Sequence, residues 1–176
     1  RERIPNPTSL SMFAEVTARV MGSHQIEVIM CDHVASTPMV SLAVRKLGAD
    51  LGVVITASHN PPSYNGFKLK SSYGGPSIPD DIAAVENHIP DKAMKDLASL
   101  EEMISNRKLS YMNLEDMYFD HVVSSFDLDA IRNAGFGVGY DAMYGAGYLI
   151  FPRILPQAHL LHCEYNPSFL GQAPEP

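Results

Sequence analysis

The sequence predicts an α/β protein, built from three-layer α/β/α units with mostly parallel sheets and arranged as two partial domains. Two short apolar runs rich in β-branched residues, 26–30 and 51–55, follow helical patterns at 8–21 and 37–47. A second succession of strand, glycine-rich turn, helix and strand covers 136–163. Strands that alternate with helices at this spacing are typical of parallel crossover connections.

The first predicted helix ends at Gly22 and has an apolar face, formed by Leu10, Phe13, Ala14, Thr17, Val20 and Met21. Thr37 is the expected cap of the second helix, because Pro38 is tolerated in a first turn, and Gly48 ends that helix. We expect this helix to connect 26–30 and 51–55 as parallel neighbours.

A further helix from about Asp80 is expected to turn Ile82, Val85 and Ile89 inward. Residues 90–110 are charged and weakly patterned, which predicts a surface excursion leading to a domain boundary. We therefore place the partial domains at 1–108 and 109–176. A helix from Asn113 is expected to cross between them, before a strand at 136–140, a helix at 148–155 and a strand at 159–163.

The composition excludes several function classes. The chain has 176 residues, 45% of them hydrophobic, and a formal net charge of −7 without a run rich in Lys and Arg, which argues against nucleic-acid binding. No apolar run reaches the roughly 18–20 residues that span a bilayer, and the first residues lack the apolar core of a signal peptide. Cys31 and Cys163 are expected to be free thiols in buried strands of a cytoplasmic protein.

The run 56–62 follows the apolar strand 51–55 and carries a hydroxyl and an imidazole, in Ser58 and His59. Ligands bind at the carboxyl ends of strands in open α/β sheets, so Ser58 is a candidate nucleophile. Pro61 and Pro62 take the chain out of regular structure and present the serine rigidly. The alternative is a turn serine that bonds only its own backbone.

Thr-Ala-Ser-His-Asn-Pro (56–61) with Tyr-Asn-Gly-Phe-Lys (64–68) resembles the phosphoserine loop of the α-D-phosphohexomutases, the phosphoglucomutase/phosphomannomutase family. The resemblance extends to 37–49, which is similar to the first domain of that family. It also includes 141–147 and 166–176, which are similar to parts of the second domain. Nearly the whole chain from residue 9 is covered.

The resemblance implies an isomerase of carbohydrate metabolism that interconverts hexose 1-phosphates and hexose 6-phosphates through a bisphosphorylated sugar. Ser58 would carry the phosphoryl group, with His59 and Lys68 as further catalytic residues. Substrate or phosphate contacts would come from Thr56, Asn60 and Asn65. A magnesium ion would bind through the phosphate of Ser58, and the partners would be hexose phosphates and a hexose bisphosphate.

Other parts of that family are not found in the sequence. An Asp-Gly-Asp-x-Asp-Arg metal loop, a sugar-recognising loop and a C-terminal phosphate-binding loop are all absent. We therefore expect a fragment that is inactive by itself and could self-associate through an exposed sheet edge. The alternative is a non-catalytic α/β module that retains the serine loop for binding or assembly.

Several residues also have simpler interpretations. Lys68 could be a solvent-facing strand lysine, and Asn65-Gly66 a hairpin turn between Tyr64 and Phe67. The glycines of 144–147 form no complete nucleotide fingerprint, and strand alternation separates His159, His162, Cys163 and Glu164 as metal ligands. A serine hydrolase is disfavoured, because Ser58 lies in no Gly-x-Ser-x-Gly elbow.

Overall fold

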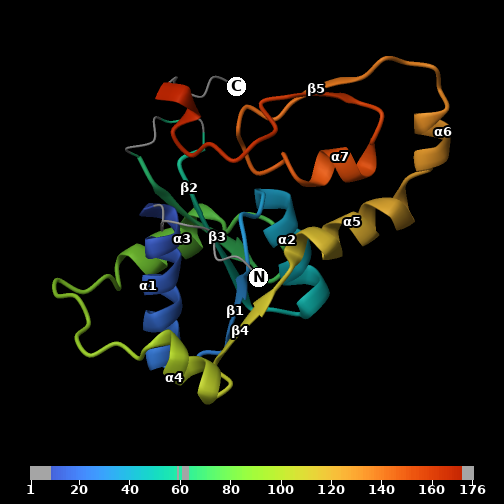
Figure 1. Ribbon diagram of the computed structural model, residues 1–176. Helices are drawn as coiled ribbons and strands as arrows, with labels where there is room; N and C mark the ends of the chain where they lie inside the picture. The colour runs from blue at the N-terminus through green and yellow to red at the C-terminus, as the bar shows by residue number, and fades with distance from the viewer. Residues whose placement is uncertain (1–8, 59, 61–63, 172–176) are drawn as a thin grey trace.

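The structure is a computed structural model that describes residues 9–58, 60 and 64–171 (Figure 1). Its helices are α1 (Ser9–Ser23), α2 (Thr37–Leu47), α3 (Pro79–Glu86), α4 (Leu100–Ser105), α5 (Leu114–Ser125), α6 (Leu128–Arg132) and α7 (Ile150–Ile154). Its strands are β1 (Val28–Cys31), β2 (Leu51–Thr56), β3 (Gly66–Ser71), β4 (Leu109–Met112), β5 (Gly139–Asp141) and β6 (His159–Leu161). A short 3₁₀ helix, η1, covers Phe169–Gly171.

The strands of the described residues form three two-stranded sheets, of which β1–β4 and β5–β6 are parallel and β2–β3 is antiparallel. The mixed α/β class with mostly parallel sheets is confirmed. The expected pairing of 26–30 with 51–55 is wrong, because β1 pairs with β4 and β2 pairs with β3. A hydrophobic run identifies a strand, but nothing within the run identifies its neighbour.

Helices pack on both sides of these strands. α1 contacts β1 and β2, whereas α2 contacts β2 and β3 (Figure 1). The central hydrophobic cluster joins α2, α5 and α7 through Met39, Ala43, Leu114 and Ile150, which are 1–7% exposed. These contacts make α2 the helix on which the β2–β3 hairpin and the second half of the chain both pack.

The ends of α2 follow the sequence closely, with one correction. Ser36, in extended conformation, is the N-cap, and Thr37 is the first helical residue. Pro38 lies in the first turn as expected. Gly48 ends the helix in the left-handed region, at φ 64°, where glycine has no steric penalty.

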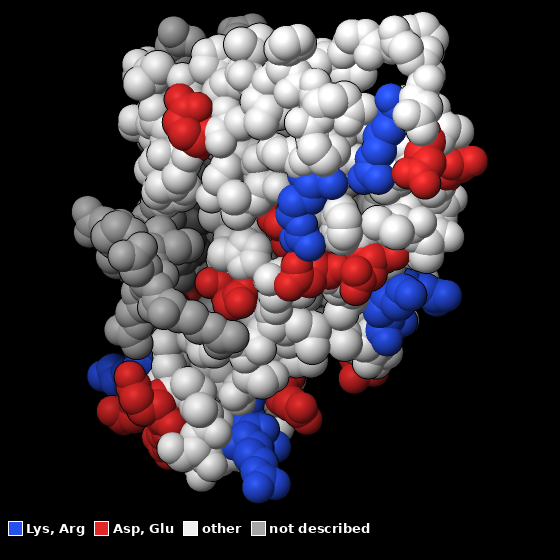
Figure 2. All heavy atoms as spheres, turned by 45° about the vertical axis from the view of Figure 1, so that its right-hand side comes forward, with Lys and Arg blue, Asp and Glu red and all other residues white. Residues whose placement is uncertain are grey.

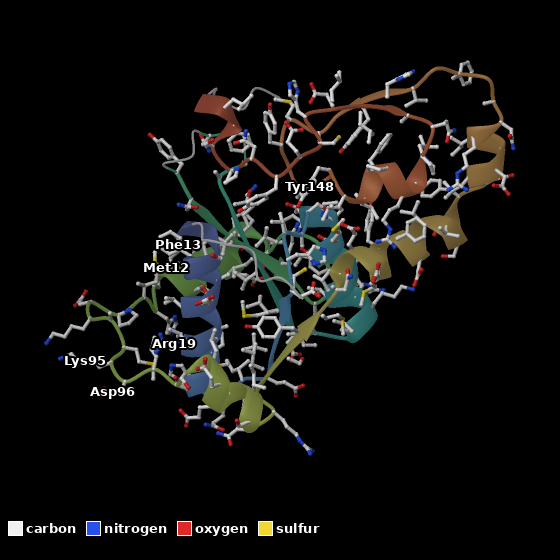
Figure 3. All side chains as sticks on the ribbon, in the orientation of Figure 1. Met12, Phe13, Arg19, Lys95, Asp96 and Tyr148 are labelled. Carbon is white, nitrogen blue, oxygen red and sulfur yellow. The ribbon has the colours of Figure 1, made fainter. Side chains whose placement is uncertain are left out.

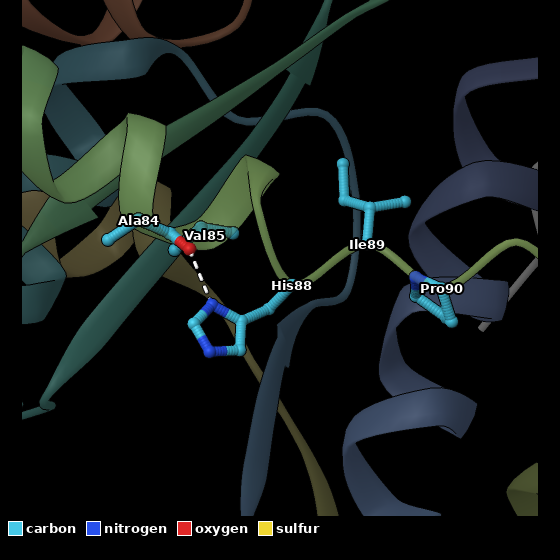
Figure 4. A pocket seen from close by; sticks show the side chains of 5 residues that line it. All are labelled: Ala84, Val85, His88, Ile89 and Pro90. Carbon is cyan, nitrogen blue, oxygen red and sulfur yellow. Dashed lines mark hydrogen bonds between the residues drawn. The ribbon is translucent and has the colours of Figure 1, made fainter.

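Two predicted apolar faces are more exposed than expected. On α1, Phe13 is 42% exposed next to Met12 (Figure 3), while Ala18 is buried. On α3 and just after it, Val85 and Ile89 are 52% and 68% exposed and, with Ala84, His88 and Pro90, line a shallow apolar hollow (Figure 4). Ile82 is 37% exposed. Helical periodicity predicts the apolar face of α3 correctly. Among the described residues, however, no helix or strand makes an extensive contact with α3.

Residues 87–99 form a surface excursion. The predicted range of 90–110 is wrong beyond residue 99, because α4 and the start of β4 lie within it. Arg19 of α1 holds the C-terminal end of the excursion, because its guanidinium donates hydrogen bonds to the carbonyl oxygens of Ala98 at 2.8 Å and Leu97 at 3.1 Å. In Figure 3, Lys95 and Asp96 lie in this excursion beside α1. The charged segment is therefore tied back to the helix.

α5 is the predicted helix from Asn113, whose side-chain oxygen accepts a 3.0 Å hydrogen bond from the amide of Asp116 and caps the helix. It packs on both α2 and α7. β4, immediately before it, pairs with β1 in the first half of the chain. The boundary between 108 and 109 stays a prediction.

The second predicted crossover unit is confirmed as β5, α7 and β6. Asp141, at the end of β5, accepts hydrogen bonds from the Met143 amide at 2.8 Å and from His162 at 2.9 Å. These bonds, the amide first, hold the pKa of Asp141 below its ordinary value. The turn 142–147 is therefore fastened to β6.

Among the described residues, no helix has both the length and the apolar character that crossing a bilayer requires. Figure 2 shows acidic and basic side chains interspersed on one face, without a continuous basic area. Cys31 and Cys163 are free thiols, as predicted, and both are partly buried. Cys31 lies in β1, whereas Cys163 lies just beyond β6.

Arg153 connects α7 to α5. Its guanidinium lies 2.8 Å from both Glu115 Oε1 and Asp116 Oδ1 and 4.4 Å from the centre of the Phe119 ring. Hydrogen bonds to Glu115 and Asp116 raise the pKa of Arg153 above its ordinary value. The Glu115 side chain is only 7% exposed, so Arg153 supplies a hydrogen-bond donor and an opposite charge to a nearly buried carboxylate.

We expect Arg153→Met to lower the free energy of unfolding by about 1–3 kcal/mol, because the buried Glu115 carboxylate would lose its strongest donor. Urea denaturation of the protein measures this change. Arg153→Lys keeps the positive charge but lacks the planar guanidinium. Its free energy of unfolding should lie between those of the original protein and Arg153→Met. A methionine variant as stable as the original would show that Glu115 needs no cation.

Candidate functional site

The β2–β3 hairpin positions the candidate serine. β2 and β3 pair along their whole length, from Leu51 opposite Ser71 to Thr56 opposite Gly66. Ser58 follows two residues after Thr56, so it lies at the carboxyl end of β2 as predicted. Its side chain is exposed. The paired strands thus provide a rigid base for the loop that carries the serine.

Local hydrogen bonds shape the first residues of this loop. The Ser58 amide donates to Thr56 Oγ1 at 3.0 Å. The Asn60 backbone amide and side-chain amide both donate to the Ala57 carbonyl oxygen at 3.0 Å. Ser58 itself has a φ of 56°, a left-handed conformation that is uncommon for a residue with a side chain. Thr56 and Asn60 therefore fasten the turn on both sides of the serine.

The strand register places Lys68 on a defined face. Residues directly opposite in an antiparallel pair share a face, so Lys68 lies with Val54, its partner, and on the same side as Thr56. α2 covers this face, since a β-carbon at Gly52 would lie 2.5 Å from Val44 Cγ2 of α2. Lys68 is nevertheless exposed. The Lys68 side chain is therefore accessible to solvent and lies on the α2 side of the hairpin.

The reversal between the strands is longer than predicted. Gly66 already pairs with Thr56, so the connection covers 57–65 and Asn65-Gly66 is not a tight turn. A β-carbon at position 66 would lie 2.9 Å from the Thr56 carbonyl oxygen, which explains the glycine there. Asn65 is exposed beside it.

The described part of the loop brings Thr56, Ser58 and Asn60 together, and Lys68 and Asn65 lie on the paired strand and next to it. His59 lies outside the described residues. Sequence reasoning missed a second group of reactive side chains, Cys31, Asp32 and His33, at the end of β1. Its signal was an unusual triplet of metal-binding residue types directly after an apolar strand.

These features define an α/β protein that presents an exposed serine on a loop at the carboxyl end of a strand. Residues 8–96 match the family described as phosphoglucomutase/phosphomannomutase, alpha/beta/alpha domain I. Residues 116–176 match alpha/beta/alpha domain II of the same family. The chain belongs to the phosphoglucomutase/phosphomannomutase family and covers its domain I and the start of its domain II.

Individual relatives agree with this assignment. A phosphoglucomutase of Staphylococcus aureus (strain MRSA252) is 30% identical over 169 residues, which cover 89% of this chain and 30% of the relative. A crystal structure from Thermus thermophilus, assigned as a phosphomannomutase, matches with a TM-score of 0.80 at 29% identity, over 94% of this chain and 37% of that one. The open form of parafusin, a phosphoglucomutase of Paramecium, shares the fold, with a TM-score of 0.64 at 21% identity over 86% of this chain and 33% of that one. The chain thus spans about a third of the length of these relatives.

Proposed function

We propose that Ser58 is the phosphoryl carrier of a phosphohexomutase, which interconverts hexose 1-phosphates and hexose 6-phosphates. The observation that carries the proposal is the exposed Ser58 on a turn fastened by Thr56 and Asn60, in a chain of this family. Phosphoryl transfer needs positioning and charge stabilisation more than covalent chemistry from the protein. A fastened turn supplies that positioning for the serine oxygen.

In the proposed reaction, the bond between phosphorus and Ser58 Oγ breaks as a bond to the free hydroxyl oxygen of the sugar phosphate forms. The hydroxyl proton passes to a base, and the serine oxygen keeps the electron pair of the broken bond. The bisphosphorylated sugar then turns round and returns its other phosphoryl group to Ser58, which gives the isomeric product. Each half therefore balances without an external oxidant or co-reactant.

Lys68 is the proposed proton carrier, since its exposed amine lies on the same face of the hairpin as Thr56. His59 is proposed as a further donor to the phosphoryl oxygens. Thr56, Asn60 and Asn65 are the proposed substrate contacts. Thr56 and Asn60 would play this part in addition to their hydrogen bonds within the turn. The phosphate oxygens would thus meet both amide donors and a positive charge.

Magnesium is proposed as the counter-ion of phospho-Ser58, because a phosphoserine carries about −1.5 to −2 charges at neutral pH. The described residues do not complete such a site. The cluster of three potential metal ligands found among them is Cys31–Asp32–His33, which does not include Ser58. We therefore assign no step of the reaction to the ion.

The proposed substrates are hexose phosphates and a hexose bisphosphate, and the proposed location is the cytoplasm. By itself, the chain 1–176 is proposed to be inactive, because it spans only about a third of its relatives. Among the described strands, β1 and β2 each pair on one side only, which leaves edges for the proposed self-association. The same partial coverage favours the second candidate function, a non-catalytic module that uses the serine loop for binding.

Mass spectrometry tests the proposal directly. The full-length protein, incubated with hexose 1,6-bisphosphate and magnesium, should gain one phosphate, which peptide mapping places on Ser58. Ser72, an exposed serine in the turn after β3, is the matched internal control and should stay unmodified. Interconversion of the sugar phosphates without phosphate on Ser58 would contradict the mechanism, and neither activity nor phosphate would favour the binding module.

A further inference from the structure

Cys31, Asp32 and His33 form a compact group of side chains at the carboxyl end of β1. One ligand atom from each residue lies within 4.8 Å of the other two. The Asp32 amide donates to the Met112 carbonyl oxygen at 3.1 Å, which extends the β1–β4 pairing by one residue beyond Cys31. Figure 1 shows these two strands side by side, leading into α2 and α5. The backbone of the group is therefore held by a parallel ladder.

The residue types of this group are those that zinc prefers. A thiolate, an imidazole and a carboxylate bind Zn²⁺ at about 2.0–2.3 Å, which puts ligand atoms about 3.3–3.8 Å apart in a tetrahedron. The ligand atoms lie within 4.8 Å of one another, but Asp32 Oδ1 and His33 Nδ1 are in direct contact, so these two atoms would have to move apart by about 1 Å to share an ion. Asp32 is exposed, whereas Cys31 packs against the central hydrophobic cluster. An ion there would be reachable from solvent on one side and shielded on the other.

The two ring nitrogens of His33 have different neighbours. Nδ1 contacts Asp32 Oδ1 directly, and Nε2 lies 3.9 Å from Glu115 Oε2. Metal-binding histidines commonly direct the second ring nitrogen to a carboxylate, which fixes the ring. Glu115 fits this supporting role, because it is 7% exposed and Arg153 holds its other oxygen. Nδ1 then faces the cluster.

The charges of the group match a divalent cation. Thiolate and carboxylate ligands from Cys31 and Asp32 contribute two negative charges, which a +2 ion would neutralise. Glu115 and Asp116 share the single Arg153 guanidinium, and the Asp116 side chain is exposed to solvent. Magnesium, which prefers oxygen ligands and water, suits the thiolate poorly.

We propose that Cys31, Asp32 and His33 form a binding site for a thiophilic divalent cation of the zinc type, with Glu115 orienting the histidine. Three protein ligands leave a fourth tetrahedral position for water or another small ligand. The cluster does not include Ser58. It does not depend on whether Ser58 carries phosphate.

Cobalt titration tests the proposal, because Co²⁺ replaces Zn²⁺ and reports thiolate ligation by a near-ultraviolet charge-transfer band. In the full-length protein, first stripped with a chelator, the band should reach its maximum with one equivalent of Co²⁺ bound at the thiolate and should disappear when Zn²⁺ is added. An excess of Mg²⁺ should leave the band unchanged. Cys31→Ser should abolish the band, and His33→Gln should weaken binding about 10–100-fold. Cys163→Ser is the matched control and should bind like the original protein.

A second measurement needs no variant and so does not depend on variants folding. Saturating Zn²⁺ should protect Cys31 from alkylation by iodoacetamide while Cys163 keeps reacting at its original rate. Absence of the charge-transfer band, or its persistence in Cys31→Ser, would overturn the proposal. Equal reactivity of Cys31 with and without Zn²⁺ would overturn it too, and the triplet would then be a His33–Asp32 pair beside a thiol.

Discussion

Replacing Ser58 with alanine is expected to lower hexose-phosphate interconversion by the full-length protein about 10³-fold or more. Removing a covalent nucleophile eliminates the phosphoryl-enzyme pathway, and the remaining binding groups accelerate the reaction only weakly. The fold should not change, because the Ser58 side chain is exposed and its turn is held through backbone and neighbouring groups. A coupled assay of product formation, with far-ultraviolet circular dichroism on the same samples, measures both properties.

Two controls separate chemistry from loop shape. Ser72→Ala removes another exposed loop serine and should keep activity within about twofold. Thr56→Val removes the hydroxyl that accepts the 3.0 Å hydrogen bond from the Ser58 amide. It should reduce turnover while still allowing phosphate on residue 58, since it loosens the serine without removing its oxygen. An alanine variant at 58 with near-normal activity would refute the phosphoserine mechanism.

The loop could be predicted from sequence because its parts are contiguous. An apolar strand followed by small residues and prolines determines where Ser58 lies, whatever the rest of the chain does. The triplet 31–33 is contiguous as well and has a signal in the sequence, but the surroundings of its histidine could not be predicted in the same way. Its histidine lies 3.9 Å from Glu115 of α5, and Glu115 in turn pairs with Arg153 of α7. Only folding brings these three parts of the chain together.

The fold shows the same limit. Periodicity and capping residues predicted α1 and α2 to within two residues and the start of α5 to within one, since those signals are local, although α1 continues past the expected stop at Gly22 to Ser23. Strand pairing is not local: β1 takes β4 as its partner, although β2 comes sooner in the sequence. The apolar face of α3 shows that an amphipathic pattern predicts a helix without revealing whether anything covers it.

Gly74 connects the hairpin to α2, and Gly74→Ala is expected to lower the free energy of unfolding by about 3 kcal/mol. Two effects add. Gly74 has a φ of 83°, where a side chain is strained, and an added β-carbon would lie 2.5 Å from the Ser41 carbonyl oxygen. That oxygen belongs to the backbone of α2, so a side-chain rotation cannot relieve the clash. Urea denaturation measures the change.

Gly48→Ala separates the two effects, because Gly48 has a left-handed φ of 64° but nothing lies within 4 Å of the added carbon. Gly48→Ala should lower the free energy of unfolding by only about 1 kcal/mol, which is the contribution of the backbone strain alone. The difference between the variants then measures how tightly the turn 71–77 packs on α2. The turn directly follows β3, the strand that carries Lys68 and pairs with β2. Equal losses in both variants would mean that the turn moves away from α2 without cost, and the hairpin would then be anchored by its β2 contacts alone.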